Sequence, residues 1–372
     1  MLDSIDKPIY HMQSHLEVIL SQSVKRPRIA DVARLAGVSE GTVSVVLNNR
    51  VGEHVRVSEE TQQKIWDAVR QLGYVANPVA QSLAGGQTHI IAIFTFESIF
   101  PMDSRSFYYP FLIGIEEEAE IHGYDILLVT GSNGSGQKVI GSRRHIYQNG
   151  INRLRRADGA ILLGYGDQQE VQQLIDEDYP FVFVGRRNSR HDNISYIAAD
   201  YVAATIELVH YLRQNGHQRI AYLRSIRDTE ASDDRERGVQ MALEPTFASN
   251  TNWLWRGTPD QLTETLITDY QQRDFTAFIV EDDALGLRLL EVTDQLGLHC
   301  PVDFSLAVLG NPLNPLVEVP DWTSISIPRR EMGREAFRML LELLKRPVAE
   351  RTTPMRKTLT CTFKTGQTVR RL

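Results

Sequence analysis

The feature that most constrains this 372-residue chain is a pair of short helical patterns separated by a glycine near its start. Apolar residues recur at helical spacing over 29–36, and Gly37 can adopt the left-handed conformation that ends a helix. Ser39 is a suitable N-cap for a second short helix. The residues of that second helix that we expect to face inward are Val43, Val46 and Leu47.

The outward face of the second helix indicates a function. Its residues are small or polar, namely Glu40, Gly41, Ser44, Val45 and Asn48. A short helix with such a face, held against another helix by a tight corner, is typical of proteins that insert a helix into the major groove of DNA. A plain helical hairpin would share the apolar spacing, but it would not need this corner together with a hydroxyl-rich outer face. The segment therefore predicts DNA binding.

Two further patterns follow this motif. Ser58 and the acids after it are placed to cap a third helix, and Gly73 to end it, so that three helices enclose a small core over 26–76. The segment 77–86 has a proline near its start and two glycines at its end, which bound a helix of fewer than three turns. So short a helix is unstable alone in water, and we expect it to form when it packs against DNA or a twin.

With these motifs, the segment 29–86 resembles the DNA-binding headpiece of the lactose-repressor/galactose-repressor (LacI/GalR) family of transcriptional regulators. The resemblance implies a ligand-responsive repressor that binds a palindromic operator in double-stranded DNA as a homodimer. It implies a hinge helix at 77–87 that enters the minor groove, where Leu83 wedges between base pairs. The alternative for Leu83 is a linker leucine packed on the next domain. The DNA-binding residues implied are Ile29, Ser39, Glu40, Gly41, Thr42, Ser44, Val45, Asn48, Asn77, Ala80, Ser82 and Leu83.

The chain departs from the family where bases are read. Many members carry an arginine at the position of Val45, where it can bond guanine in the major groove. Glu40 could instead accept a hydrogen bond from a cytosine amino group, and Val45 could touch a thymine methyl. We therefore expect the hinge to contribute much of the sequence specificity.

Composition limits the remaining classes of protein. The net charge of −7 excludes a generally basic coat for nucleic acid, and no apolar run is long enough to span a bilayer. Residues 1–25 lack the pattern of a signal peptide and are predicted to be a flexible extension, with a short amphipathic segment or an overlong assigned start as the alternatives. Cys300 and Cys361 are too few for a metal cluster or a disulfide framework. A cytoplasmic protein without a cofactor or metal is expected.

From residue 88 onward, short apolar runs alternate with amphipathic segments, which predicts two doubly wound parallel sheets. The first series has strands at 90–94, 126–129, 160–163 and 181–184, with helices at 107–122, 138–155 and 168–178. The second has strands at 194–198, 219–223, 276–280 and 305–309, with helices at 201–215, 232–243, 259–272 and 284–296.

This α/β pattern resembles the family's two-lobed core, which is similar to periplasmic binding proteins. The resemblance implies that the chain crosses between lobes three times. It assigns 88–197 and 329–346 to the N-lobe, and 198–328 and 347–372 to the C-lobe, with 357–370 finishing on the second lobe.

In open parallel sheets, ligands bind beyond the carboxyl ends of the strands, so the cleft between the lobes is the expected site for a small polar effector. Phe107, Tyr108, Arg186 and Asp282 follow predicted strands, and Arg235 matches a family arginine that binds effectors. Three of them have a plainer alternative: Arg186 as a solvated charge, Asp282 as a helix cap, Phe107 as core. The resemblance implies a sugar or a sugar derivative.

The chain also departs from the family's sugar-binding pattern. The run 281–283 is shorter than in many members, and Asn311 follows a strand where an acid is frequent. The effector is therefore not expected to be an ordinary free hexose.

Other classes of protein fit less well. The glycine-rich run 131–136 lacks the ending of a phosphate-binding loop, and no nucleophile or metal motif accompanies it, so an enzyme is not expected. A two-lobed small-molecule binding protein without a regulatory DNA role is the remaining alternative. The headpiece argues against it.

Overall fold

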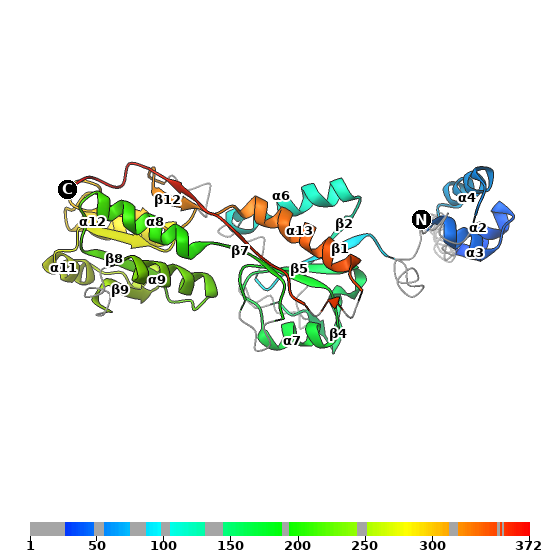
Figure 1. The fold of residues 1–372 in the computed structure, drawn as a ribbon, viewed down its shortest axis with the longest axis horizontal. Helices are drawn as coiled ribbons and strands as arrows, with labels where there is room; N and C mark the ends of the chain where they lie inside the picture. The colour runs from blue at the N-terminus through cyan, green and yellow to red at the C-terminus, as the bar shows by residue number, and fades with distance from the viewer. Residues whose placement is uncertain are drawn as a thin grey trace, which may run out of the picture. The chain divides into compact units, whose positions relative to one another are not determined.

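The computed structural model describes residues 27–47, 56–74, 87–97, 105–130, 144–187, 193–243, 251–311, 319–347, 350–351 and 353–372. The chain divides into two compact units, Met1–Thr88 and His89–Leu372 (Figure 1). In the described part of the chain, no helix is both long enough and apolar enough to cross a membrane.

The first unit is a bundle of three helices, α2 (Ile29–Ala36), α3 (Glu40–Leu47) and α4 (Glu59–Leu72). They enclose a small apolar core. The fully buried members of that core are Val32, Ala33, Val43, Val46, Ile65 and Ala68. This confirms the predicted helix-turn-helix and its third helix. The predicted extension 1–25 and the hinge helix 77–87 lie outside the described residues, apart from residue 87.

Local signals in the sequence set the ends of these helices. Gly37 has a φ of 68° and donates its N–H to the carbonyl of Ala33, which ends α2. The hydroxyl of Ser39 accepts a hydrogen bond from the N–H of Thr42 at 3.1 Å and so begins α3. The hydroxyl of Ser58 caps α4 in the same manner.

The second unit contains two six-stranded sheets. The first sheet has the strand order β13-β7-β6-β5-β1-β2, and all of its pairs are parallel. Its strands are β1 (Ile90–Thr95), β2 (Asp125–Val129), β5 (Gly159–Leu163), β6 (Phe181–Val184), β7 (Tyr196–Ala199) and β13 (Arg356–Leu359).

Both faces of the first sheet are covered by helices. Ile91 and Ile93 of β1 belong to the same apolar cluster as α6 (Arg105–His122) and α13 (Arg329–Lys345). Ala92 and Phe94, which alternate with them, belong to the cluster that includes α7 (Gln168–Asp176). This two-residue alternation places α7 on the opposite face from α6 and α13, which lie side by side in Figure 1.

The second sheet has the order β14-β12-β11-β10-β8-β9 and is parallel except for β14. Its strands are β8 (Ile220–Ser225), β9 (Leu254–Gly257), β10 (Ala277–Val280), β11 (Ser305–Val308), β12 (Thr323–Ser326) and β14 (Thr362–Lys364). Its helices are α8 (Tyr201–Gln214), α9 (Glu230–Ala242), α11 (Glu264–Gln272) and α12 (Asp283–Gln295), with short 3-10 turns at Thr251–Trp253 and Pro259–Gln261.

The chain passes between the two sheets three times, from β7 to α8, from β12 to α13 and from β13 to β14. The predicted two-lobed α/β core is therefore confirmed. Two of the predicted assignments are wrong. The strand expected at 194–198 in the second sheet is β7 of the first, and residues 356–359, assigned to the C-lobe, form β13 of the first sheet. β13 pairs with β7, which offers a free edge that the sequence pattern does not reveal.

The helix predicted at 138–155 is also wrong in its described part. Residues Tyr147–Gln148 (β3) and Ile151–Asn152 (β4) form a two-stranded hairpin, and a 3-10 turn follows at Arg153–Arg156. Asn149 and Gly150 join the strands with φ angles of 51° and 75°. An Asn-Gly pair with two positive φ angles is the preferred two-residue hairpin turn, so this local signal overrides the apparent helical spacing.

Candidate functional site

The face of α3 predicted to meet DNA is accessible at its N-terminal end. Ser39, Glu40 and Gly41 are exposed, whereas Thr42 is half-buried. The hydroxyls of Ser39 and Thr42 lie 2.8 Å apart, so both groups already take part in the helix cap. The other described residues of the prediction, Ile29, Ser44 and Val45, are half-buried. Asn48, Asn77, Ala80, Ser82 and Leu83 lie outside the described residues.

A cavity of about 180 Å³ lies where the strands of the first sheet end and the second lobe begins. Glu97 follows β1, Tyr165 follows β5, Arg186 follows β6, and Arg227 follows β8 of the second sheet. Because the carboxyl ends of parallel strands meet at one edge, these residues converge as expected. The predicted residues Phe107, Tyr108 and Arg186 line this cavity, whereas Arg235 and Asp282 do not.

Two ion pairs join the lobes across this cleft. Nε and Nη2 of Arg186 donate to the two carboxylate oxygens of Asp234 in α9, at 2.9 and 3.0 Å. Arg187 donates to Glu230 at 3.1 Å, and its guanidinium lies 4.3 Å from the centre of the Phe183 ring. These arginines are thus bound by acids of the opposite lobe and are not simply solvated charges.

Tyr108 provides a buried polar group on the N-lobe side of the cleft. Its hydroxyl donates a hydrogen bond of 3.0 Å to the carboxylate of Glu97. Burial, together with the neighbouring charge of Glu97, raises the pKa of Tyr108 well above its usual range, so the hydroxyl remains a donor. Phe107 keeps 38% of its surface exposed, and its ring lines the cavity. It is not a core residue.

Arg235 lies behind the cavity wall. Its guanidinium stands 4.1 Å from the centre of the Tyr201 ring, and Nη1 donates to Glu281 at 3.3 Å. Tyr201 lines the cavity, whereas Arg235, which stacks on the Tyr201 ring, does not. Asp282 is the N-cap of α12 and accepts the N–H of Leu285 at 2.9 Å. Burial raises the pKa of Asp282.

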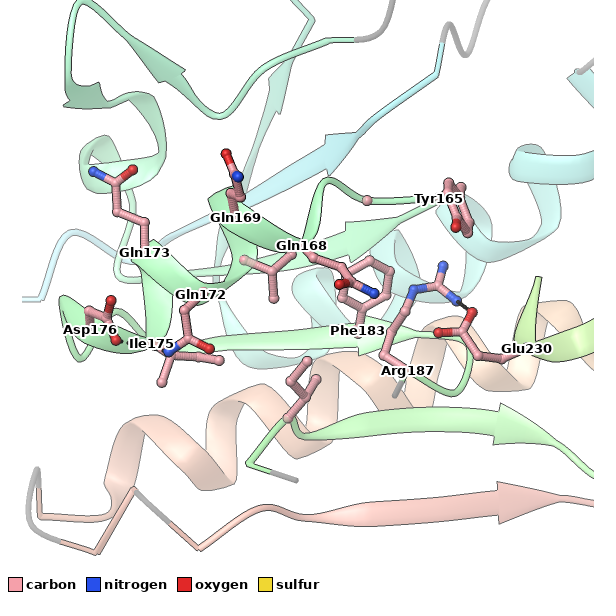
Figure 2. Close-up of a pocket in the computed structure, with 13 residues that line it drawn as sticks. Tyr165, Gln168, Gln169, Gln172, Gln173, Ile175, Asp176, Phe183, Arg187 and Glu230 are labelled. Atoms are coloured by element: carbon pink, nitrogen blue, oxygen red, sulfur yellow. Dashed lines mark hydrogen bonds and ion pairs between the residues drawn. The ribbon is translucent and has the colours of Figure 1, made fainter. Parts of the chain in front are cut away.

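A larger cavity of about 440 Å³ lies beside α7 in the N-lobe (Figure 2). Glutamines of α7 form one wall, and Phe183 and Arg187 form another, with the Arg187–Glu230 ion pair at its edge. It adjoins the interlobe cavity, because Tyr165 and Arg187 line both. The smaller cavity is the stronger candidate, because it lies at the strand ends and is lined from the second lobe by α8, α9 and the loop before α9, whereas Glu230 is the one residue of that lobe in the lining of the larger cavity.

Several residues of this site were missed by sequence reasoning. Asp234 and Glu230 lie in α9 and reach the cleft only because α9 packs at the lobe boundary. Tyr201 and Arg227 line the cavity from the start of α8 and from the loop after β8. Arg227 does follow a predicted strand, so the rule that found Arg186 could have found it. The acids carry no local signal.

Comparisons with known proteins agree with this architecture. The family described as "Bacterial regulatory proteins, lacI family" matches residues 28–77, and the one described as "Periplasmic binding protein-like domain" matches residues 209–369. The HTH-type transcriptional repressor PurR of Vibrio vulnificus (strain CMCP6) is 31% identical over 330 residues, which cover 85% of this chain and 92% of PurR.

Solved structures show the same fold. A transcriptional regulator CelR–cellobiose complex is 26% identical, with a TM-score of 0.58, and the match covers 92% of this chain and 100% of CelR. The lac repressor dimer bound to operator and the anti-inducer ONPF gives a TM-score of 0.67 at 21% identity, covering 93% and 100% of the two chains.

Proposed function

The chain belongs to the LacI family of bacterial transcriptional regulators, and we propose that it is a repressor that binds a palindromic operator as a homodimer and senses a small polar effector in its interlobe cleft. The observation that carries this proposal is the combination of an accessible α3 on a helix-turn-helix unit with a cavity whose walls come from both lobes of the core. Two-fold symmetry of the protein would match that of a palindromic site.

The proposed DNA contacts come from the N-terminal turn of α3 and from the hinge. Exposed Glu40 and Gly41 would face the major groove, while the hydroxyls of Ser39 and Thr42 suit phosphates, which position the headpiece without reading sequence. Leu83 would open a central base step in the minor groove. Specificity would then depend on the deformability of that step as well as on base contacts.

A charge placed on α3 tests the DNA-binding face. In Gly41→Glu the new side chain meets only the Ser39 hydroxyl, at 3.7 Å from the Cβ, so the headpiece can fold. Repulsion by nearby phosphates should weaken operator binding by about tenfold per headpiece, or about a hundredfold for a dimer. Gln71→Glu on the exposed surface of α4 adds the same charge as a control. Electrophoretic mobility shifts on an operator selected from random DNA measure both. Equal losses in the two variants would contradict the assignment of α3.

The effector would act by changing the angle between the lobes. A cavity of about 180 Å³ is smaller than the roughly 300 Å³ at which typical ligand pockets begin, so a ligand larger than one ring requires a wider angle. Arg186 and Asp234 join the lobes, and a ligand that separates them would change the spacing of the two hinges in a dimer. Only an effector that binds the two lobe angles with different affinities can shift operator binding.

The nature of the effector is a proposal as well. CelR was solved with cellobiose, which supports a sugar or a sugar derivative here. The relatives are regulators, and we propose that the effector is bound without being turned over.

Filling the cavity tests where the effector binds. Ala231 lines the cavity from α9, and Ala231→Trp should abolish the effect of an activating or inducing compound on operator binding, with binding in its absence retained. Met241 lies on the same helix and is 65% exposed, so Met241→Trp is the matched control. A full effector response in Ala231→Trp would remove the interlobe cavity as the site.

Light scattering at micromolar concentration tests the proposed oligomeric state. It should give a dimer, and a stable tetramer would contradict the proposed homodimer.

A further inference from the structure

Arg329, the first residue of α13, is a buried cation without an anionic partner among the described residues. It is 5% exposed, yet its guanidinium takes part in no hydrogen bond or ion pair with any residue in the described ranges, and its Nε is a buried donor without an acceptor. Its one resolved contact is with the ring of Phe107, whose centre lies 5.0 Å from its guanidinium carbon. Burying a charge without a partner is unfavourable, so a group in this state calls for an explanation.

The position of Arg329 ties it to the interlobe cavity. Arg329 does not itself line the cavity in this structure, but Phe107, on which it stacks, does, and so does Met332, one turn further along α13. Pro328 is the N-cap of α13 and provides no side-chain cap for the first turn, in which the N–H of Arg329 donates to the carbonyl of Ile327. The positive end of a 17-residue helix and a buried guanidinium therefore lie together behind one wall of the cleft.

The other arginines nearby are already neutralised. Arg186 and Arg187 bind Asp234 and Glu230, and Arg235 binds Glu281. The acid that acts electrostatically on Arg329 is Asp283, but no hydrogen bond or ion pair within the described residues joins the two side chains. Among the residues that the structure describes, Arg329 is therefore a buried cation to which no acid is paired.

A second unmatched arginine faces the same cavity from the other lobe. Arg227, in the loop between β8 and α9, lines the cavity, and its side chain makes no ion pair or hydrogen bond in the described part of the structure. Of the charged residues that line the cavity, three are arginines and two are acids, so the wall carries a net positive charge. Both unmatched charges have the same sign.

We propose that the effector carries an anionic group, a carboxylate or a phosphate, that is received by Arg329 and the N-terminus of α13, with Arg227 binding it from the opposite lobe. The guanidinium fork matches the geometry of both anions, and a helix N-terminus favours negative charge. The inference rests on the proposed function, because it concerns the effector of the same cleft. It narrows the ligand class from polar compounds to organic acids or phosphate esters.

The first test needs no ligand. An unpaired buried charge that is kept for binding should lower the stability of the free protein, so Arg329→Met, which retains the contact with Phe107, should raise the melting temperature. Arg235→Met is the matched control, because it removes a paired arginine and leaves the buried carboxylate of Glu281 with hydrogen bonds from Ser225 and Ser232 but without its cation, and it should lower the melting temperature. A lower melting temperature for Arg329→Met would assign Arg329 a structural role and overturn the proposal.

The second test uses inorganic phosphate as the probe. Thermal unfolding of the full chain in rising phosphate, compared with chloride at matched ionic strength, should show saturable stabilisation. The phosphate affinity derived from it should be at least tenfold weaker in Arg329→Met and in Arg227→Gln. Arg288→Gln, which alters a half-buried arginine of α12 that does not line the cavity, should respond as the parent protein does. No saturable stabilisation at tens of millimolar phosphate, or stabilisation that survives in Arg329→Met, would overturn the proposal.

A matched set of sugars then identifies the anion and separates the two proposals. Glucose, gluconate and glucose 6-phosphate differ in charge. Tighter binding of gluconate indicates that the site takes a carboxylate, and tighter binding of glucose 6-phosphate indicates that it takes a phosphate. Glucose acting on operator binding equally in the parent and in Arg329→Met would overturn the anion proposal and leave the effector cleft intact. Loss of operator binding in Gly41→Glu depends on neither result.

Discussion

The ion pair between Arg186 and Asp234 should hold the lobes together measurably. Its two hydrogen bonds measure 2.9 and 3.0 Å, and the Asp234 side chain is 9% exposed, against 26% for Arg186. Removing one partner of a fully buried pair costs about 3–5 kcal/mol. Because water reaches Arg186, we expect the coupling energy of this pair to be about 1–3 kcal/mol.

A double-mutant cycle isolates this coupling. The free energies of unfolding in urea would be compared for the parent protein, Asp234→Asn, Arg186→Gln and the double variant. The ion pair of Asp234 with Arg237 is lost in both variants that change Asp234, so its contribution cancels from the coupling energy. The control is the more exposed pair Arg288–Glu291 within α12, for which the coupling should stay below about 0.5 kcal/mol. A coupling for Arg186–Asp234 no larger than that of the control would refute the argument that this pair joins the lobes.

Three further predictions concern the packing, the pH dependence and the DNA specificity of the chain. A Cβ at Gly333 would overlap the carbonyl of Phe111 where α13 crosses α6, so Gly333→Ala should lose about 1–3 kcal/mol in thermal melts. Gly286→Ala, with its nearest neighbour at 3.4 Å, should change the stability far less, and equal losses would refute the reasoning. His217 is buried between Thr276 and the carbonyl of Arg370, and burial lowers its pKa from the usual 6.5. The unfolded chain therefore binds the proton first, so urea unfolding should show stability falling from about pH 7.5 to 5.5 and a flatter profile in His217→Gln. In binding titrations at one salt concentration, Leu83→Ala should cost a few kcal/mol of discrimination between operator and random DNA, more than Val45→Ala does, and the reverse order would contradict a hinge-centred specificity.

The sequence by itself determined the headpiece and most of the core elements. Gly37, Ser39 and Ser58 act on residues three or four positions away, and the structure places helix ends at each of them. Eight strands of the two six-stranded sheets were readable because buried parallel strands are continuous apolar runs, whereas β9, β12, β13 and β14 were not predicted. The same rule placed Phe107, Tyr108 and Arg186 at the cleft, since residues that follow parallel strands must converge at one edge.

Tertiary structure decided what depends on partners distant in the chain. β13 lies in the first sheet because β7 has a free edge for it, although the two are about 160 residues apart. Arg186 contacts Asp234 although 48 positions separate them in the sequence, and Arg329 contacts Phe107 over an even longer separation. Neither contact therefore leaves a local pattern in the sequence. Hydrophobic spacing shows which residues are buried, but side-chain charges are matched only once the helices are packed. Sequence spacing therefore placed residues at the cleft proposed for the ligand, and only the packed core showed that Arg329 and Arg227 have no ion pair among the described residues.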